Sequence, residues 1–79
     1  MTTIEQRTRQ VYDYIITYRK LNGNSPTLRE IGDACHVAHT SILTNLARLE
    51  GMGWIVREFS KSRGITLGEN APDYDPNEH

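Results

Sequence analysis

Long hydrophobic runs are missing from this 79-residue sequence. No stretch approaches the roughly 18 apolar residues that a membrane-spanning helix requires. The N-terminal MTTIEQRTRQ also lacks the apolar core of a secretory signal peptide. With 37% hydrophobic and 24% charged residues, the sequence predicts one globular domain that stays in the cytoplasm, away from membranes.

Cysteine is almost absent as well, because Cys35 is the single one in the sequence. One cysteine excludes an internal disulfide bond and agrees with a reducing compartment. His36 and His39 are close to Cys35 in the chain, but the third histidine, His79, is terminal. The four ligands of a structural zinc site are therefore not available locally. We expect a small buried thiol beside two surface or turn histidines, and no bound metal.

Known catalytic motifs are missing too. The sequence contains no Gly-rich phosphate loop, no HExxH pattern and no Gly-x-Ser-x-Gly pattern. The acids that precede residue 68 are scattered over expected helix surfaces, and a chain of this length has no room for a large catalytic cavity. We expect neither an enzyme nor a cofactor.

The near-neutral total charge of −1 conceals an uneven distribution along the chain. Residues 1–67 hold all nine Lys and Arg residues and six of the ten acids, which gives a net charge of +3. Residues 68–79 hold the other four acids and no cation, which gives −4. The body is therefore basic, and the composition GENAPDYDPNEH predicts an acidic, disordered tail.

The N-terminal part of the chain carries the three- and four-residue spacing of apolar side chains that is typical of an amphipathic helix. This helix is predicted from Thr3 to about Leu21. Gly23 can adopt the left-handed conformation of a helix C-cap, and Pro26 prevents the helix from continuing. A second element must therefore begin after the run NGNSP.

Two further helices follow. Thr27 is the expected N-cap of a short helix, with Glu30 in capping-box spacing, and this helix should end near residues 34–35. Residues 36–38 form a tight connection, and residues 39–51 show a third helical pattern of apolar side chains. A short helix, a three-residue turn and a longer helix make up a helix-turn-helix motif.

A β-hairpin is predicted after the third helix. Residues 54–59 and 65–67 are rich in β-favouring side chains, and the segment SKSRG separates them. The expected fold is mainly α (α+β): a three-helix winged helix-turn-helix with a C-terminal two-stranded β-hairpin wing. Residues 1–67 would form the domain and residues 68–79 the tail.

The third helix has apolar residues on one side and small hydroxyl residues on the other. Such a surface can enter the major groove of duplex DNA, where Ser and Thr bond base edges and an apolar side chain meets a thymine methyl. The candidate base-contacting residues are His39, Thr40, Ser41, Leu43 and Thr44. Ordinary solvent-exposed helices carry similar residues, so this face alone leaves DNA binding open.

Cations and hydroxyl groups near this helix could hold the DNA backbone. Lys61 and Arg63 lie at the tip of the expected wing, and the first turn of the second helix offers N–H groups to an anion. The candidate backbone-contacting residues are Ser25, Thr27, Arg29, Arg48, Lys61 and Arg63. For Ser25 and Thr27, the alternative is that they only cap the second helix.

Three segments resemble the N-terminal winged helix-turn-helix domain of LexA repressors: NGNSPTLREIGDAC, NLARLEGMGWI and SRGITL. The resemblance covers about residues 5–67 and is most specific in PTxxEI and SRGI. It implies a winged-helix fold and a DNA-binding transcription regulator, repressor-like and of bacterial or phage type.

The sequence also departs from that family. LexA repressors continue into a self-cleaving domain that dimerises them, whereas an acidic tail follows the wing here. The resemblance therefore implies neither self-cleavage nor that route to a dimer. The third helix lacks the glutamates and asparagine expected near its start, so a LexA-type operator does not follow either.

The predicted partner is double-stranded DNA, which would bring the protein to the nucleoid; a homodimer stays open. The alternative is a winged-helix module or accessory subunit that binds another protein, with the acidic tail contacting a basic partner or masking the DNA face. Wing cations on one surface with the third helix favour DNA. An exposed apolar patch around Leu43 and Trp54 favours a protein partner.

Overall fold

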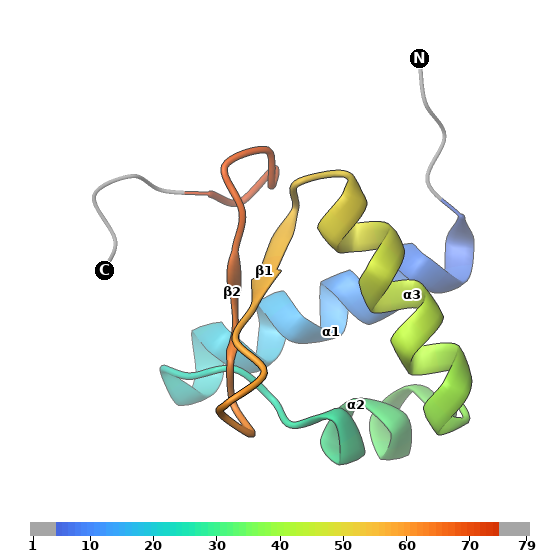
Figure 1. The fold of residues 1–79 in the computed structure, drawn as a ribbon. Coiled ribbons are helices and arrows are strands. Elements are labelled where there is room, and N and C mark those ends of the chain that lie inside the picture. Colours follow the sequence, from blue (N-terminus) through green and yellow to red (C-terminus); the bar gives the residue numbers. More distant parts are fainter. Residues whose placement is uncertain (1–4, 75–79) are drawn as a thin grey trace.

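Three helices and a β-hairpin make up the computed structural model, which describes residues 5–74 (Figure 1). In chain order they are α1 (Gln6–Asn22), α2 (Leu28–Cys35), α3 (His39–Gly51), β1 (Ile55–Arg57) and β2 (Ile65–Leu67). The predicted three-helix winged helix-turn-helix is thereby confirmed. The predicted start of the first helix at Thr3 lies outside the described residues. Among residues 5–74, no helix is both long enough and apolar enough to cross a membrane.

The ends of the helices follow from local sequence signals. Gly23 caps α1 with a left-handed φ of 75°, and its N–H donates to the Arg19 carbonyl, as expected for this position. At the start of α2, the Glu30 N–H donates to Thr27 Oγ1 (3.2 Å) and the Thr27 N–H donates to Glu30 Oε1 (2.8 Å). The predicted capping box is confirmed, and α2 ends at Cys35 as expected.

The core lies where the three helices and the hairpin meet; in Figure 1, α3 crosses in front of α1 and α2 lies below it. Each helix turns its apolar stripe inward, which removes apolar surface from water and drives the packing. Cys35 is buried in this core, as predicted. The buried apolar side chains are Val11, Tyr12, Ile15, Ile16, Ile31, Cys35, Ile42, Leu46, Leu49, Ile55, Ile65 and Ala71.

The hairpin is antiparallel, and one of its faces packs on the core. Ile55 pairs with Leu67, and Val56 pairs with Thr66 on the exposed face. The first strand is shorter than predicted because the Glu58 carbonyl accepts from the Lys61 N–H (3.2 Å) in a turn, and the Glu58 N–H donates to the Gly64 carbonyl (2.8 Å) at the base of the loop. A Cβ on Gly64 would lie 2.2 Å from the Glu58 carbonyl oxygen, so this closure requires glycine. The loop of residues 58–64 is called the wing tip below.

Residues 68–74 pack against the body, whereas the sequence predicted a disordered tail from residue 68. Ala71 is buried, and the Asn70 N–H donates to the Gly53 carbonyl (3.0 Å). Tyr12 Oη donates to the Asp73 carboxylate (2.8 Å) from a ring that is fully buried. Composition alone could not reveal this packing, because one small apolar side chain and a few specific hydrogen bonds produce it. Residues 75–79 lie outside the described part of the chain.

Candidate DNA interface

The five candidate base-contacting residues all lie on the exposed side of α3. Ile42, Leu46 and Leu49 are on the opposite side, at most 2% exposed. The largest of the five candidates, Leu43, is 37% exposed, which leaves it available for a thymine methyl group. The helix therefore presents a narrow, mainly hydroxyl surface to solvent.

One of the hydroxyl groups on this surface is already engaged. Thr44 Oγ1 donates to the Thr40 carbonyl one turn earlier (3.1 Å). Since its hydrogen is used within the helix, the oxygen is oriented to accept a hydrogen bond from outside. Amino groups of adenine or cytosine in the major groove are donors of the required kind.

A buried polar pair, which was not predicted from the sequence, fixes α3 against α1. Thr8 Oγ1 donates to Asn45 Oδ1 (2.6 Å), and Asn45 Nδ2 donates to the Ser41 carbonyl (2.8 Å). Thr8 is 1% exposed and Asn45 is 4% exposed. The signal was present in the sequence, because Asn45 interrupts the apolar stripe of α3 between Ile42 and Leu46. A buried amide in that stripe needs a partner, and the partner sets the rotation of the helix.

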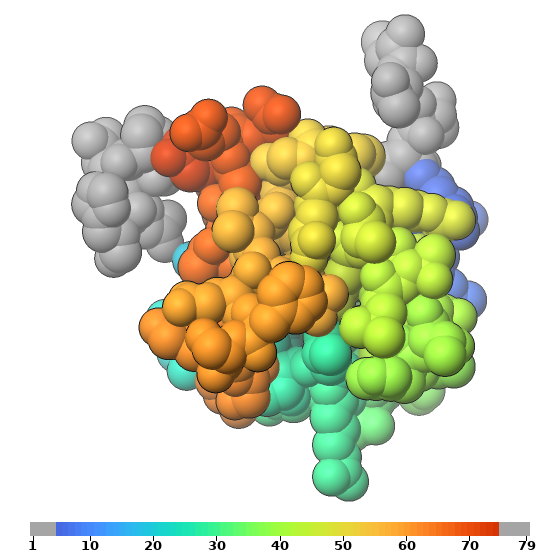
Figure 2. All heavy atoms as spheres, viewed as in Figure 1, coloured from blue at the N-terminus to red at the C-terminus, as the bar shows by residue number. Residues whose placement is uncertain are grey.

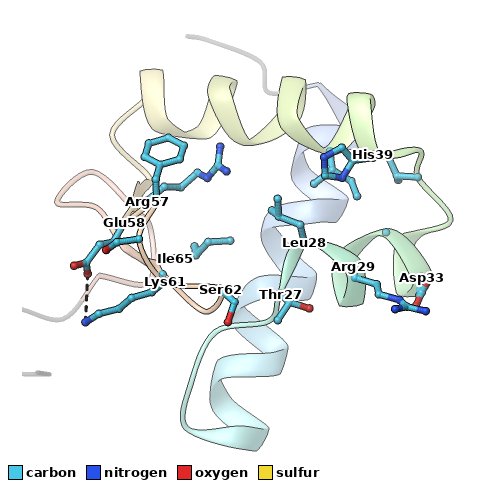
Figure 3. Close-up of a pocket in the computed structure, with 16 residues that line it drawn as sticks. Thr27, Leu28, Arg29, Asp33, His39, Arg57, Glu58, Lys61, Ser62 and Ile65 are labelled. Carbon is cyan, nitrogen blue, oxygen red and sulfur yellow. Dashed lines mark ion pairs between the residues drawn. The ribbon is translucent and has the colours of Figure 1, made fainter.

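The wing tip lies beside α3 on one face of the molecule, with α2 between them (Figure 2). A groove of about 670 Å³ separates the wing tip from the start of α2 and α3. Leu28 and Ile65 lie at its centre, with His39 and Arg29 on the helix side and Lys61 on the wing side (Figure 3). The structure thus brings candidates from α2, α3 and the wing around one concave surface.

Three candidate phosphate ligands are exposed cations: Arg29 and Lys61 line this groove, and Arg48 lies further along α3 at a second hollow. Lys61 Nζ lies 3.6 Å from a Glu58 carboxylate oxygen, and the guanidinium of Arg48 pairs with Glu5. Both pairs are about half exposed or more, so each contributes roughly 0–1 kcal/mol. A phosphate group can replace such weak partners without a large loss.

The other three backbone candidates are placed differently. Ser25 is 2% exposed; its hydroxyl donates to the Ile65 carbonyl and accepts from Arg19 Nη1 (2.9 Å), so it cannot reach a phosphate. This hydroxyl thereby joins the α1–α2 loop to β2. Thr27 is half-buried as the N-cap of α2. The guanidinium of Arg63 is bound to Glu30, Tyr18 and the Ser25 carbonyl.

Glu30 is the group that receives several of these donors. The Thr27 backbone N–H, and next the Arg63 guanidinium, lower the pKa of Glu30 to about 2. Tyr18 Oη also donates to it (3.2 Å). The carboxylate therefore stays ionised at neutral pH and holds α1, α2 and the wing together.

A second hollow adjoins α3 where α1 begins, and it adds a cation that sequence reasoning overlooked. This hollow, of about 390 Å³, is lined by Arg7 together with Ser41, Thr44 and Arg48. Arg7 is exposed, and its guanidinium donates to the Cys35 carbonyl (3.3 Å). Only the packing of α1 against α3 reveals that Arg7 lies beside the candidate reading face.

Leu43 and Trp54, the two apolar side chains named for a protein partner, do not form an exposed patch. Trp54 is half-buried and packs edge-to-face on Tyr12, with ring centroids 4.9 Å apart. Leu43 is only partly exposed. Among residues 5–74, no group of three or more His, Cys, Asp or Glu side chains is placed to hold a metal ion.

Three helices, a wing and an exposed hydroxyl face on the helix after the turn define a winged helix-turn-helix domain. The sequence matches the family described as LexA DNA binding domain over residues 1–64, and the chain belongs to this family. The resemblance noted from its motifs is thereby confirmed.

Curated relatives are named LexA repressor. One from Exiguobacterium sibiricum is 37% identical over 76 residues, which cover 95% of this chain and 37% of the relative. One from Geobacillus sp. strain WCH70 is 40% identical over 68 residues, covering 85% of this chain and 33% of the relative. The chain spans about a third of the length of these curated relatives.

Proposed function

We propose that this protein binds duplex DNA in a sequence-specific manner and represses transcription. The observation that carries the proposal is the exposed face of α3 beside a wing, in a domain of the LexA DNA-binding family. The relatives' name supports the repressor role. Catalysis is not part of the proposal, since the matched region is a DNA-binding domain.

In this proposal α3 enters the major groove, and its exposed residues meet the base edges. Those residues are His39, Thr40, Ser41, Leu43 and Thr44. Thr44 accepts from a base amino group, and Leu43 contacts a thymine methyl.

The DNA backbone would lie over the groove between α2 and the wing tip. Arg29 and Lys61 neutralise phosphates there, and Arg48 and Arg7 add two cations at the second hollow beside α3. Thr27 Oγ1 already accepts from the Glu30 N–H, which leaves its hydroxyl hydrogen to donate to a phosphate oxygen.

Few phosphate contacts imply modest affinity. A body with a net charge of +3 is weakly basic for a DNA-binding domain. The affinity of one copy should therefore fall as the salt concentration rises, with the slope expected for only about three or four neutralised phosphates. A homodimer on two half-sites would double that number and is included in the proposal, as are a cytoplasmic location and nucleoid association when bound.

The test has two steps. Fluorescence anisotropy with a labelled random-sequence duplex at 50 mM and 200 mM salt, conditions across which electrostatic binding changes strongly, measures nonspecific affinity and its salt dependence. Selection from a randomised duplex library then recovers any preferred site. We expect salt-sensitive binding in the first step and an enriched sequence in the second. Absence of binding to any duplex at the lower salt concentration would refute the proposal.

Apolar exposure on the wing supports a second candidate, a protein-binding winged helix. Phe59 on the wing tip is 80% exposed, and its ring stacks on the Arg57 guanidinium at 4.6 Å. One aromatic side chain is a small anchor for a protein partner. Phe59→Ser would leave duplex binding nearly intact under the DNA proposal and abolish partner capture under the alternative.

A further inference from the structure

Arg63 belongs to the wing tip, and its side chain, although partly exposed, is directed toward the helices. One guanidinium nitrogen lies 2.8 Å from Glu30 Oε1, 2.9 Å from Tyr18 Oη and 3.0 Å from the Ser25 carbonyl oxygen. The other nitrogen lies 3.4 Å from Glu30 Oε2. The guanidinium also lies 5.7 Å from the centre of the Tyr18 ring. The acceptors of its N–H groups therefore lie on α1, on the α1–α2 loop and on α2.

Glu30 joins these contacts to the start of α2. The same carboxylate accepts from the Thr27 N–H, from Tyr18 Oη and from Arg63. A carboxylate shared among three donors is fixed in position, and it transmits that position to the wing through a planar, two-pronged guanidinium. This cluster of Arg63, Glu30 and Tyr18 is called the wing anchor below.

A neighbouring set of contacts holds the base of the wing. Ser25 Oγ donates to the Ile65 carbonyl on β2, and Arg19 Nη1 donates to the same carbonyl (3.2 Å). Apart from Arg63, the wing tip has no such bond to the helices within residues 5–74. Lys61, the other cation of the wing tip, pairs with Glu58 of the same loop.

We propose that Arg63 is a positioning residue: it fixes the wing against α2 through Glu30 instead of contacting a DNA phosphate. This inference rests on the proposed DNA binding, because positioning the wing matters only if the wing meets DNA. Lys61 then remains the cation of the wing tip that contacts the backbone. Arg63 acts through the placement of the loop that carries Lys61.

Three matched substitutions separate the two roles: Arg63→Gln, Glu30→Gln and Lys61→Gln. Glutamine at position 30 keeps a carbonyl oxygen for the Thr27 N–H, so the capping box of α2 can persist. The affinity for a random duplex is measured by anisotropy over a series of salt concentrations. Circular dichroism confirms that each variant is folded.

If Arg63 positions the wing, Arg63→Gln and Glu30→Gln each weaken binding by roughly threefold to tenfold without lowering the salt slope. Lys61→Gln lowers the slope by about 0.9, the amount expected for one phosphate. Glu30→Gln is the sharpest of the three, because removal of a negative charge would otherwise strengthen DNA binding. A lowered slope in Arg63→Gln together with tighter binding in Glu30→Gln would overturn the inference.

Arg63→Lys adds a further distinction. A lysine is a good phosphate ligand but lacks the planar fork that reaches Glu30, Tyr18 and Ser25 at once. We expect Arg63→Lys to bind nearly as weakly as Arg63→Gln. Wild-type affinity in Arg63→Lys would show that only the charge is needed, and would overturn the positioning role.

A measurement without DNA keeps this test separate from the proposed function. Denaturant unfolding of the wild type, the two single variants and the Arg63→Gln/Glu30→Gln double variant should show strong non-additivity. Amide NMR shifts throughout residues 58–64 should change in both single variants. In Lys61→Gln, only the residues next to position 61 should change. If the wild type binds no duplex, DNA binding is refuted. If unfolding is additive, the wing anchor itself is refuted.

Discussion

The face of α3 and the wing lie beside each other, but their exposed side chains are held in different ways. On α3, the residues proposed to read bases point outward, and the helix is fixed from behind by the core and by the Thr8–Asn45 pair. On the wing, the guanidinium of Arg63 is exposed and yet bound to α1 and α2. Exposure and charge therefore do not suffice to identify a DNA contact. Under the proposed roles, the number and placement of intramolecular partners distinguish Arg63 from Lys61, which pairs only with Glu58 of its own loop.

The two surfaces should also respond differently to mutation. Changes behind α3 should lower stability and binding together, whereas changes on its face should lower only specific binding. Changes in the wing anchor should lower binding through geometry.

The largest effect is expected from Asn45→Ala. The substitution removes the acceptor to which the buried Thr8 hydroxyl donates and opens a small cavity between α1 and α3. We expect the free energy of unfolding to fall by about 2 kcal/mol, measured with denaturant. Asn24→Ala, in the exposed part of the α1–α2 loop, is the control and should change stability by less than about 0.5 kcal/mol. Equal effects of the two substitutions would show that the buried pair does not fix α3.

A smaller and more selective effect is expected from Thr40→Ala and Thr44→Ala on the face of α3. Each should weaken binding to a selected site by about 1 kcal/mol, or roughly fivefold. Affinity for random duplex and stability should stay unchanged, because both side chains are exposed. Thr66→Ala on the exposed face of β2 is the matched control. Equal losses on selected and random duplexes would assign these threonines to the backbone instead of the bases.

The structural features that depend on local sequence signals were predicted correctly. The capping box of Thr27 and Glu30, the C-cap at Gly23 and the full extent of α3 depend on residues close together in the chain. The apolar stripes predicted which faces are buried. Fold class and the exposed side of α3 followed from these signals.

The contacts that hold the α3 face and the wing in different ways join residues far apart in the sequence. No local sequence pattern reveals these contacts. Thr8 and Asn45 are 37 positions apart, and Glu30 and Arg63 are 33 apart. The position of Arg63 in a charged turn indicated a phosphate ligand. The sequence does not show where a guanidinium is directed, so its contacts with Glu30 and Tyr18 could not be foreseen. The burial of Ala71 was hidden for a related reason. A single alanine in an acidic segment has no pattern that distinguishes packing from exposure.

A third prediction concerns pH and the wing anchor. Because the folded-state pKa of Glu30 is lowered from 4.5 to about 2, its contribution to stability is present above pH 4.5 and is lost as the pH falls toward 2. The wild type should therefore lose its stability advantage over Glu30→Gln within that window. The effect should be modest, because the ion pair is partly exposed.

Denaturant unfolding at several pH values between 7 and 2 measures this difference. Asp13→Asn is the control, because Asp13 forms an exposed pair with Arg9 within α1 and lies outside the wing anchor. A difference between wild type and Glu30→Gln that stays constant with pH would contradict the ionic character of the anchor.

The smallest effect is expected from a deletion at the C-terminus, which should change DNA affinity at the α3 face and at the wing together. Deletion of residues 75–79 removes Asp75 and Glu78 and leaves the packed segment through Tyr74, with its Tyr12–Asp73 hydrogen bond, in place. Loss of two negative charges should tighten binding to random duplex at low salt by about twofold, and the gain should vanish at high salt because such long-range charge effects are screened. Stability should stay unchanged, whereas deletion from residue 68 should lower it by removing the buried Ala71. A gain that persists at high salt would indicate a direct contact of residues 75–79 with the DNA-binding surface, and the distinction between α3 and the wing would then have to include a third segment.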